Sequence, residues 1–130
     1  MQKEEIILYI EKKYKVKPQF PWAPKAEHMV FKHSKNKKWF ALIMGVTGGK
    51  LGLETGDIVE VINLKCDTDL STNIRMSKGI LPAYHMNKKH WISIALNVCT
   101  DEALIKECIY YSYKCVAKKD NSLLSKRGSL

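Results

Sequence analysis

The chain has 130 residues, 45% of them hydrophobic and 27% charged, which suits one folded domain and is too short for two with sizeable cores. Its 22 Lys and Arg against 13 Asp and Glu give a net charge of +9, which favours polyanionic partners, although surplus surface lysine also serves solubility. No run approaches the roughly 20 apolar residues of a membrane span and the start lacks a secretory pattern, so we expect a cytoplasmic protein.

Residues 3–14 form the first predicted element, an amphipathic helix with charged side chains on its outer side. Its buried stripe is Ile6, Ile7, Ile10 and Tyr14. Residues 17–27 contain three prolines, which forbid a regular helix. We therefore expect an extended connection that lays Phe20 or Trp22 onto the core.

The next segments predict strands. Residues 28–33 and 38–44 read as a hairpin joined by the polar loop 34–37, and the second strand is apolar on both faces, which indicates a central position in a sheet. Residues 45–57 hold five of the seven glycines and predict a long mobile connection. Residues 57–66 predict a third strand from their β-branched side chains.

A short second helix is expected next, with Asp67 as its N-cap and Gly79 as its stop. Residues 83–86 and 89–96 then predict a second hairpin with a two-residue turn at Asn87 and Lys88, because asparagine tolerates positive φ. Alternation along these strands would set Tyr84 opposite Trp91, with Lys89, on the less apolar face, and His85 opposite His90 at the outer end of the core face.

Residues 100–119 predict the last helix, capped by Thr100 and followed by a flexible tail over residues 118–130. Its buried stripe is Leu104, Ile105, Cys108, Ile109, Ser112, Cys115 and Val116. The predicted order is α-β-β-β-α-β-β-α in a single domain, residues 1–117. This is an α+β fold with a mainly antiparallel sheet and helices packed on one face.

Two interpretations of the second hairpin are open. Tyr84 and Trp91 form a stabilising cross-strand pair while the lysines keep the tip solvated, or the lysines bind phosphates and a ring stacks on a base or sugar. His85 and His90 could share a metal, but no cysteine or carboxylate lies near them in sequence to complete a site.

The remaining chemistry is sparse. The four cysteines form no C-x-x-C pair and lie in apolar segments, so we expect reduced, buried thiols. No catalytic motif is present. We therefore expect no enzymatic activity, no cofactor and no metal.

Residues 79–96, GILPAYHMNKKHWISIAL, strongly resemble the MmcQ/YjbR family, as do INLKCD at 62–67 and KHSKNKKWFALI at 32–43. The similarity runs from about Trp22 to Val116, and YHMNKKHW is a specific signature rather than a generic turn. It implies a CyaY- or frataxin-like double-wing domain that is described as DNA-binding. The frataxin-like shape also suggests iron handling, which needs an acidic surface that a chain of charge +9 lacks.

Carried over to this chain, the resemblance makes residues 33–38 and 85–90 the two wings. The candidate nucleic-acid-binding residues are Lys32, Lys35, Lys37 and Lys38 in the first wing and Tyr84, Asn87, Lys88, Lys89 and Trp91 in and beside the second. We expect a monomer that contacts DNA phosphates with low sequence specificity. The alternatives are a protein-interaction or small-ligand domain that uses the Tyr84 and Trp91 face, and an enzyme that uses His85 or His90.

Overall fold

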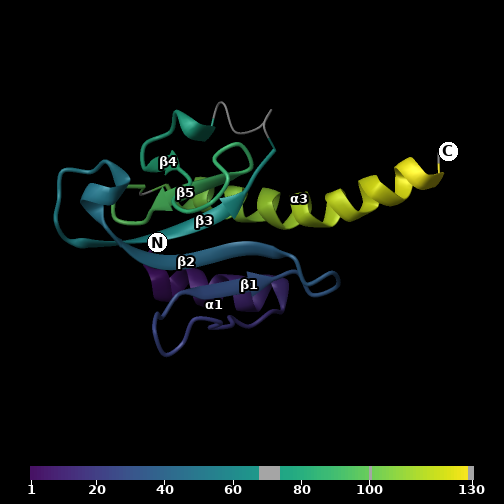
Figure 1. Cartoon of the computed structure of the whole chain (residues 1–130), viewed down its shortest axis with the longest axis horizontal. Coiled ribbons are helices and arrows are strands. Elements are labelled where there is room, and N and C mark those ends of the chain that lie inside the picture. The colour runs from purple at the N-terminus through teal and green to yellow at the C-terminus, as the bar shows by residue number, and fades with distance from the viewer. Residues whose placement is uncertain (68–73, 100, 129–130) are drawn as a thin grey trace.

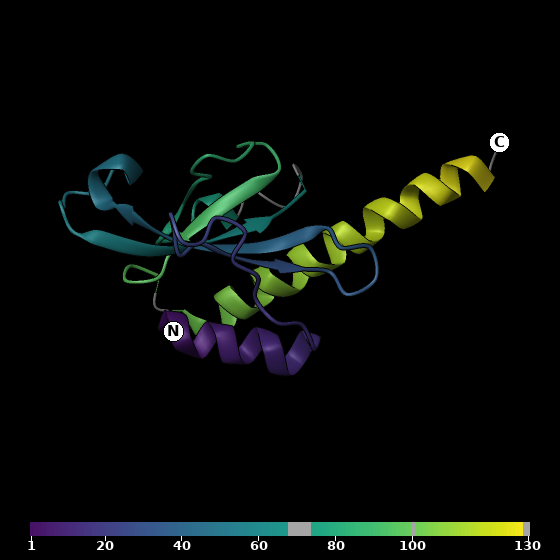
Figure 2. The same ribbon diagram turned by 60° about the horizontal axis from the view of Figure 1, so that its bottom comes forward.

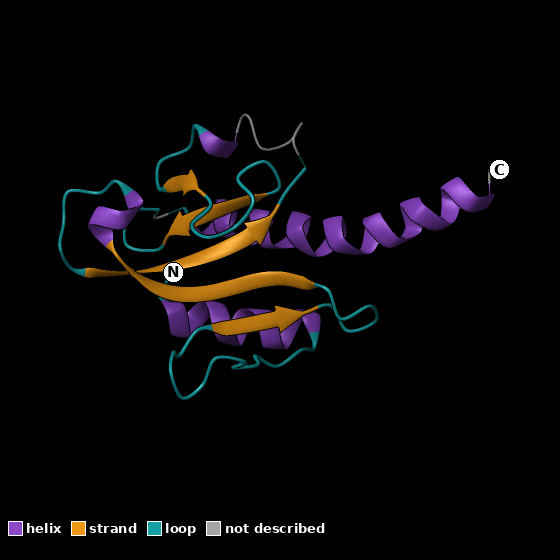
Figure 3. Ribbon diagram, viewed as in Figure 1, coloured by secondary structure: helices purple, strands orange, loops and turns teal. Residues whose placement is uncertain are grey.

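The computed structural model describes residues 1–67, 74–99 and 101–128, with side chains in the last helix described up to residue 117. Its elements are α1 (Lys3–Tyr14), β1 (Met29–Lys32), β2 (Trp39–Thr47), the 3-10 turn η1 (Gly48–Leu51), β3 (Ile58–Lys65), β4 (Ile80–Pro82), β5 (Trp91–Ala95) and α3 (Glu102–Gly128). The predicted α+β class with an antiparallel sheet is confirmed (Figure 3). Most of the expected second helix, residues 68–73, lies outside the described residues, and only positions 74 and 75 are helical.

The sheet has five strands in the order β1-β2-β3-β5-β4, and every neighbouring pair is antiparallel (Figure 1). As predicted, β2 is central, between β1 and β3. Because β2 and β5 are both antiparallel to β3, they run in the same direction. Any two loops that precede β2 and β5 therefore emerge at the same end of the sheet.

Helices α1 and α3 cover one face of the sheet (Figure 2). The predicted helix stripes are largely confirmed, since Ile6, Ile10, Ile105 and Ile109 are fully buried there, whereas Ile7, Leu104 and Cys115 are only partly buried. Ser112, also fully buried, donates its hydroxyl to the Phe40 carbonyl and accepts the Lys65 N–H at 2.8 Å. One side chain of α3 thus joins two strands, which sets the helix's position on the sheet.

The other face of the sheet is also buried, although no helix of the described chain covers it. Its core residues are Val30, Leu42, Met44, Val46, Val59, Val61 and Ala95. Partly buried side chains pack over them from the chain after β2, Leu51 and Leu53, and from the chain after β4, Tyr84 and Met86. The expectation that Trp91 lies on a less apolar face is therefore wrong, because this face is also apolar and Trp91 is itself buried.

Two predictions for the first half of the chain need correction. Phe20 and Trp22 do not reach the core, with 48% and 39% of their surface exposed, and Trp22 instead makes an edge-to-face contact with Trp39 at 5.8 Å. The glycine-rich connection is also shorter than expected, because β2 continues to Thr47 and η1 follows directly.

The last helix differs from its prediction at both ends. Thr100, the expected cap, lies outside the described residues, and the Asp101 carboxylate accepts the Leu104 N–H at 3.0 Å as an N-cap does. Helix α3 continues to Gly128, past the predicted end at residue 119, and extends beyond the sheet (Figure 2). The single domain over residues 1–117 and the flexibility of residues 118–130 stay predictions.

Within the described residues, no helix has the length and apolarity to span a membrane.

Candidate nucleic-acid interface

The candidate wing residues lie on two loops that share one end of the sheet. The first loop, residues 33–38, precedes β2, and the second loop, residues 83–90, precedes β5. Since β2 and β5 are parallel and only β3 separates them, the two loops emerge side by side at what we call the loop end of the sheet. Because β2 and β5 are two interstrand spacings apart, the roots of the loops, where they join these strands, are about 10 Å apart.

The first loop is a tight turn built on asparagine. The Asn36 side-chain oxygen accepts the Lys38 N–H at 2.9 Å, which is an Asx-type turn. Two backbone bonds close the loop: His33 N–H donates to the Lys38 carbonyl at 2.8 Å, and Lys37 N–H donates to the His33 carbonyl at 3.0 Å. Lys37 has a φ of 62°, so the chain reverses within a few residues.

Helix α3 holds this turn in place. The Asn36 amide donates to the Val116 carbonyl at 3.3 Å. His33, only 5% exposed, stacks on Tyr113 with ring centroids 4.4 Å apart and accepts the Lys35 N–H at Nδ1, at 3.1 Å. The first loop is therefore ordered before any ligand arrives, which lowers the entropy cost of binding.

The second loop is not the predicted two-residue hairpin. Strand β4 ends at Pro82, which pairs with Ile92, so the register differs by one residue from the expected one. Tyr84 N–H donates to the Ser93 hydroxyl at 3.0 Å instead of to a strand carbonyl, and His85 has a φ of 58°. These two features end the strand and turn the chain over the second face of the sheet, where Tyr84 and Met86 pack.

The expected pair of Tyr84 and Trp91 does not form. Trp91 lies opposite Lys65, whose ammonium is 5.7 Å from the ring centroid, and is only 8% exposed. The Tyr84 ring instead contacts His85, with centroids 4.0 Å apart. A ring must expose a face to stack on a base, and Trp91 exposes little of its surface. The ligand-binding role of Trp91 and the use of the Tyr84 and Trp91 face by a protein partner stay predictions.

The second loop nevertheless contains the same turn as the first. The Asn87 side-chain oxygen accepts the Lys89 N–H at 2.8 Å, and the Asn87 carbonyl accepts the His90 N–H at 3.2 Å. The two N-K-K stretches, 36–38 and 87–89, thus share one piece of turn chemistry. His85 and His90 are both exposed, and no group of three or more His, Cys, Asp or Glu among the described residues is arranged to hold a metal.

The lysines of the two loops differ in exposure and in whether their ammonium groups are hydrogen-bonded. Lys37 donates its ammonium to the Ser34 carbonyl at 3.0 Å, and Lys88 donates to the Ala83 carbonyl at 3.1 Å, so each folds back on its own loop. Lys35 and Lys89 are exposed, and within the described part of the chain their ammonium groups have no hydrogen-bond or ion-pair partner. Lys32 and Lys38 are half-buried. Among the described residues, each loop therefore presents one exposed lysine whose ammonium group has no such partner.

A buried polar row that was not predicted from the sequence supports the second loop. Asn63 and Ser93 are cross-strand neighbours on β3 and β5 and both are fully buried. The Asn63 amide donates to the Leu42 carbonyl at 3.3 Å and its oxygen accepts the Ser93 hydroxyl, which in turn accepts the Tyr84 N–H. An asparagine in the middle of an apolar strand was the available signal, because a buried amide needs partners.

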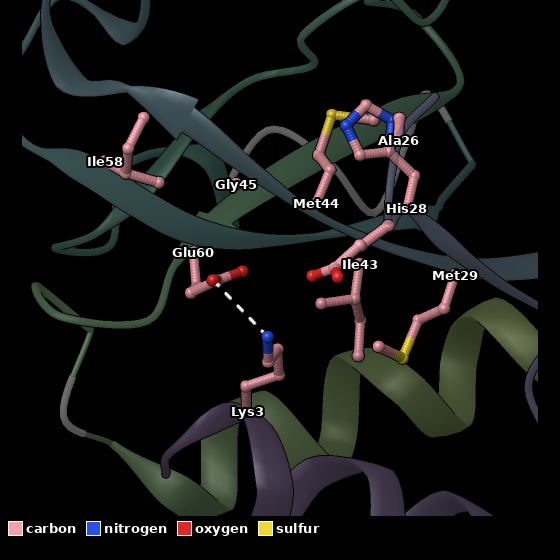
Figure 4. Close-up of a pocket in the computed structure, with 10 residues that line it drawn as sticks. Lys3, Ala26, His28, Met29, Ile43, Met44, Gly45, Ile58 and Glu60 are labelled. Carbon is pink, nitrogen blue, oxygen red and sulfur yellow. Dashed lines mark hydrogen bonds and ion pairs between the residues drawn. The ribbon is translucent and has the colours of Figure 1, made fainter. Parts of the chain in front are cut away.

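The far end of the sheet holds a cavity of about 280 Å³ (Figure 4). Met29, Ile43, Met44 and Ile58 contribute apolar walls. Its best-defined polar contact is the ion pair between Lys3 and Glu60, with Nζ and Oε1 3.5 Å apart. These charges satisfy each other, and none of the candidate residues predicted from the sequence lines this cavity.

The cysteines behave mainly as small hydrophobic residues. All four are free, and Cys66, Cys99 and Cys108 are buried as predicted, whereas Cys115 is half-buried. Burial raises the pKa of Cys108 to about 12 and that of Cys115 to about 11, with Asp67 beside Cys115 adding to the rise. These two thiols are protonated at neutral pH, so neither is a thiolate nucleophile.

The two turn asparagines make a matched pair for mutation. We expect Asn36→Ala to lower the free energy of unfolding by about 1 to 2 kcal/mol, because it removes both the turn bond and the bond to α3. Asn87→Ala removes only an exposed turn bond and is expected to cost about 0.5 kcal/mol. Urea denaturation measures both values. Equal losses would show that the Asn36 bond to Val116 contributes nothing.

The fold and these loops define the class: an α+β domain whose antiparallel sheet carries two basic, preformed loops at one end. The YjbR family model matches residues 11–115. The chain is 38% identical over 113 residues, 87% of its length and 96% of the relative's, to Bacillus subtilis YyaQ, which is described as an uncharacterised protein. It therefore belongs to the YjbR family, which confirms the resemblance in the sequence.

Solved structures support the same fold. A Pseudomonas syringae protein matches in its crystal structure with a TM-score of 0.84 and 40% identity, over 88% of this chain and 98% of that one. A Deinococcus radiodurans protein, DR2400, matches with a TM-score of 0.69 over 92% of this chain and 82% of that one. Its identity is 24%, so that likeness concerns the fold alone.

Proposed function

We propose that this protein binds double-stranded DNA through the first and second loops, with backbone phosphates as their target and little sequence specificity. One observation carries the proposal: both loops emerge at the same end of the sheet, from parallel strands with a single strand between them. Each presents an exposed lysine, Lys35 or Lys89, on a chain of net charge +9. Cations at two such points can neutralise phosphates of one duplex.

The spacing of the loops supports a duplex as the ligand. Their roots are about 10 Å apart, which lies between the widths of the minor and major grooves, about 6 and 12 Å. Loops so placed can reach phosphates on both sides of a groove. Tyr84 and Asn87 shape the second loop in this arrangement, and Lys32, Lys37 and Lys38 add to the positive potential beside Lys35.

The test is the salt dependence of binding to a short labelled duplex, measured by fluorescence anisotropy. If about four phosphates are neutralised, log K is expected to fall against log salt with a slope of roughly 3 to 4 between about 50 and 200 mM salt. Two unrelated duplex sequences are expected to bind with affinities within a few-fold of each other, because phosphate contacts carry no base information.

Three results would count against the proposal. Failure to bind a duplex at low salt would exclude it outright. An affinity that does not change with salt would exclude phosphate contacts as its basis, and a strong preference for one of the two sequences would require base contacts that these loops do not explain.

A further inference from the structure

Arg75 connects the segment before β4 to the second loop. Its guanidinium donates from Nη2 to the Lys88 carbonyl and, at 3.4 Å, to the Trp91 carbonyl. These two carbonyls bracket Lys89 and His90. One half-buried side chain therefore holds both ends of the short stretch that presents Lys89.

The other bonds that support this stretch come from the loop itself and from one backbone N–H outside it, that of Cys66. Tyr84, the second residue of the loop, is held by the bond from its N–H to the Ser93 hydroxyl. His90, the last residue, is held by Cys66 N–H, which donates to the His90 carbonyl at 2.8 Å. Between them, the Asn87 turn and the Lys88 ammonium bond only within the loop itself. In the described structure, Arg75 is the one side chain from outside the loop that bonds to its tip.

Guanidinium chemistry suits this task. Arg75 can give several N–H groups in a planar fork to two carbonyls, whereas lysine is a point donor on a flexible stem. Burial raises the pKa of the nearby Cys66 thiol, and the Arg75 charge partly offsets that rise. The guanidinium is thus engaged with the protein and directed into it rather than toward a ligand.

We propose that Arg75 is a positioning residue for the DNA contact: it fixes the Lys88–Lys89 tip of the second loop without touching DNA. The expected effect of Arg75 on DNA binding rests on the proposed function, whereas its effect on the order of the second loop does not depend on DNA. Arg75 lies outside both loops and is not among the candidate residues predicted from the sequence.

The test compares Arg75→Lys, which keeps the charge, with Lys78→Gln, a control that removes an exposed charge three residues away. Backbone ¹⁵N relaxation of the unliganded protein is the first readout. We expect order parameters at Lys88, Lys89 and His90 to fall from about 0.85 to below about 0.6 in Arg75→Lys, while those of the sheet stay unchanged. Lys78→Gln is expected to leave the loop rigid.

Duplex binding is the second readout. Arg75→Lys is expected to weaken binding about tenfold with an unchanged salt slope, because no phosphate contact is lost. If Arg75 were itself a phosphate contact, Arg75→Gln would lower the slope by about 1 and Arg75→Lys would bind normally. That pattern would overturn the proposal.

The two proposals fail in different ways. Order parameters that stay high at residues 88–90 in both Arg75→Lys and Arg75→Gln would refute the positioning role, whatever the result for DNA binding. Loss of order throughout the sheet in both variants would also refute it, because Arg75 would then support the whole domain. An Arg75→Lys loop that becomes mobile in a protein that never bound DNA would refute the proposed function and leave the structural role of Arg75 supported.

Discussion

Replacing Lys35 and Lys89 together by glutamine is expected to weaken duplex binding roughly 60-fold at 0.1 M salt. The figure follows from counterion release: each lost phosphate contact removes about 0.9 from the slope of log K against log salt, so two contacts remove about 1.8. Each single substitution is expected to remove about 0.9 from the slope and to weaken binding about 8-fold. These lysines are the informative pair because both are exposed and, among the residues that the structure describes, their ammonium groups have no hydrogen-bond or ion-pair partner.

The control for that experiment is Lys50→Gln paired with Lys25→Gln, which changes the net charge equally. Lys50 is exposed in η1, which follows β2 at the end of the sheet opposite the two loops, and Lys25 precedes Ala26, which lines the cavity at that far end. We expect the control to retain nearly all affinity. An equal loss in both double variants would mean that net charge, and not the loop end of the sheet, determines binding.

Gly79→Ala is expected to lower the free energy of unfolding by about 2 to 5 kcal/mol. Gly79 has a φ of 86°, which costs a residue with a side chain about 1 to 2 kcal/mol. A methyl group there would also lie 2.5 Å from the backbone nitrogen of Cys99 and 2.7 Å from its Cα, and overpacking against a backbone adds about 1 to 3 kcal/mol. The loss is large beside a typical total stability of about 5 to 15 kcal/mol.

Gly52→Ala separates the two causes. Gly52 has a similar φ of 80°, but a methyl group added there would meet no atom within 4 Å. Urea denaturation is expected to give about 1 to 2 kcal/mol for this variant. If the two alanine variants lose the same stability, the chain around Cys99 moves aside and the close approach of the two backbones has no energetic importance.

Much of the fold could be predicted because local signals were strong. The helix over residues 3–14 was predicted with its boundaries intact, because its apolar residues recur at helical spacing between charged ones. The first hairpin was predicted for a similar reason, since two β-branched and aromatic runs flank a short polar loop.

The second hairpin could not be predicted in the same way. Its sequence fits a two-residue turn. However, the Ser93 hydroxyl accepts the Tyr84 N–H, and the side chains of Tyr84 and Met86 pack against the apolar second face of the sheet. Tertiary packing outweighs the local turn preference there. The burial of Trp91 was missed for a related reason, because the alternation of a strand cannot show whether its second face is also covered.

The features of the candidate site also differ in whether the sequence could predict them. The sequence alone determined the charge of the chain, the family and the lysines of two N-K-K turns, because these are properties of composition and of short stretches. Only the tertiary structure decided that the two loops share one end of the sheet, that Lys35 and Lys89 have no ammonium partner within the described chain, and that Arg75 bonds to the second loop. Strand order and contacts between segments far apart in the chain settle these features, and no local pattern records them.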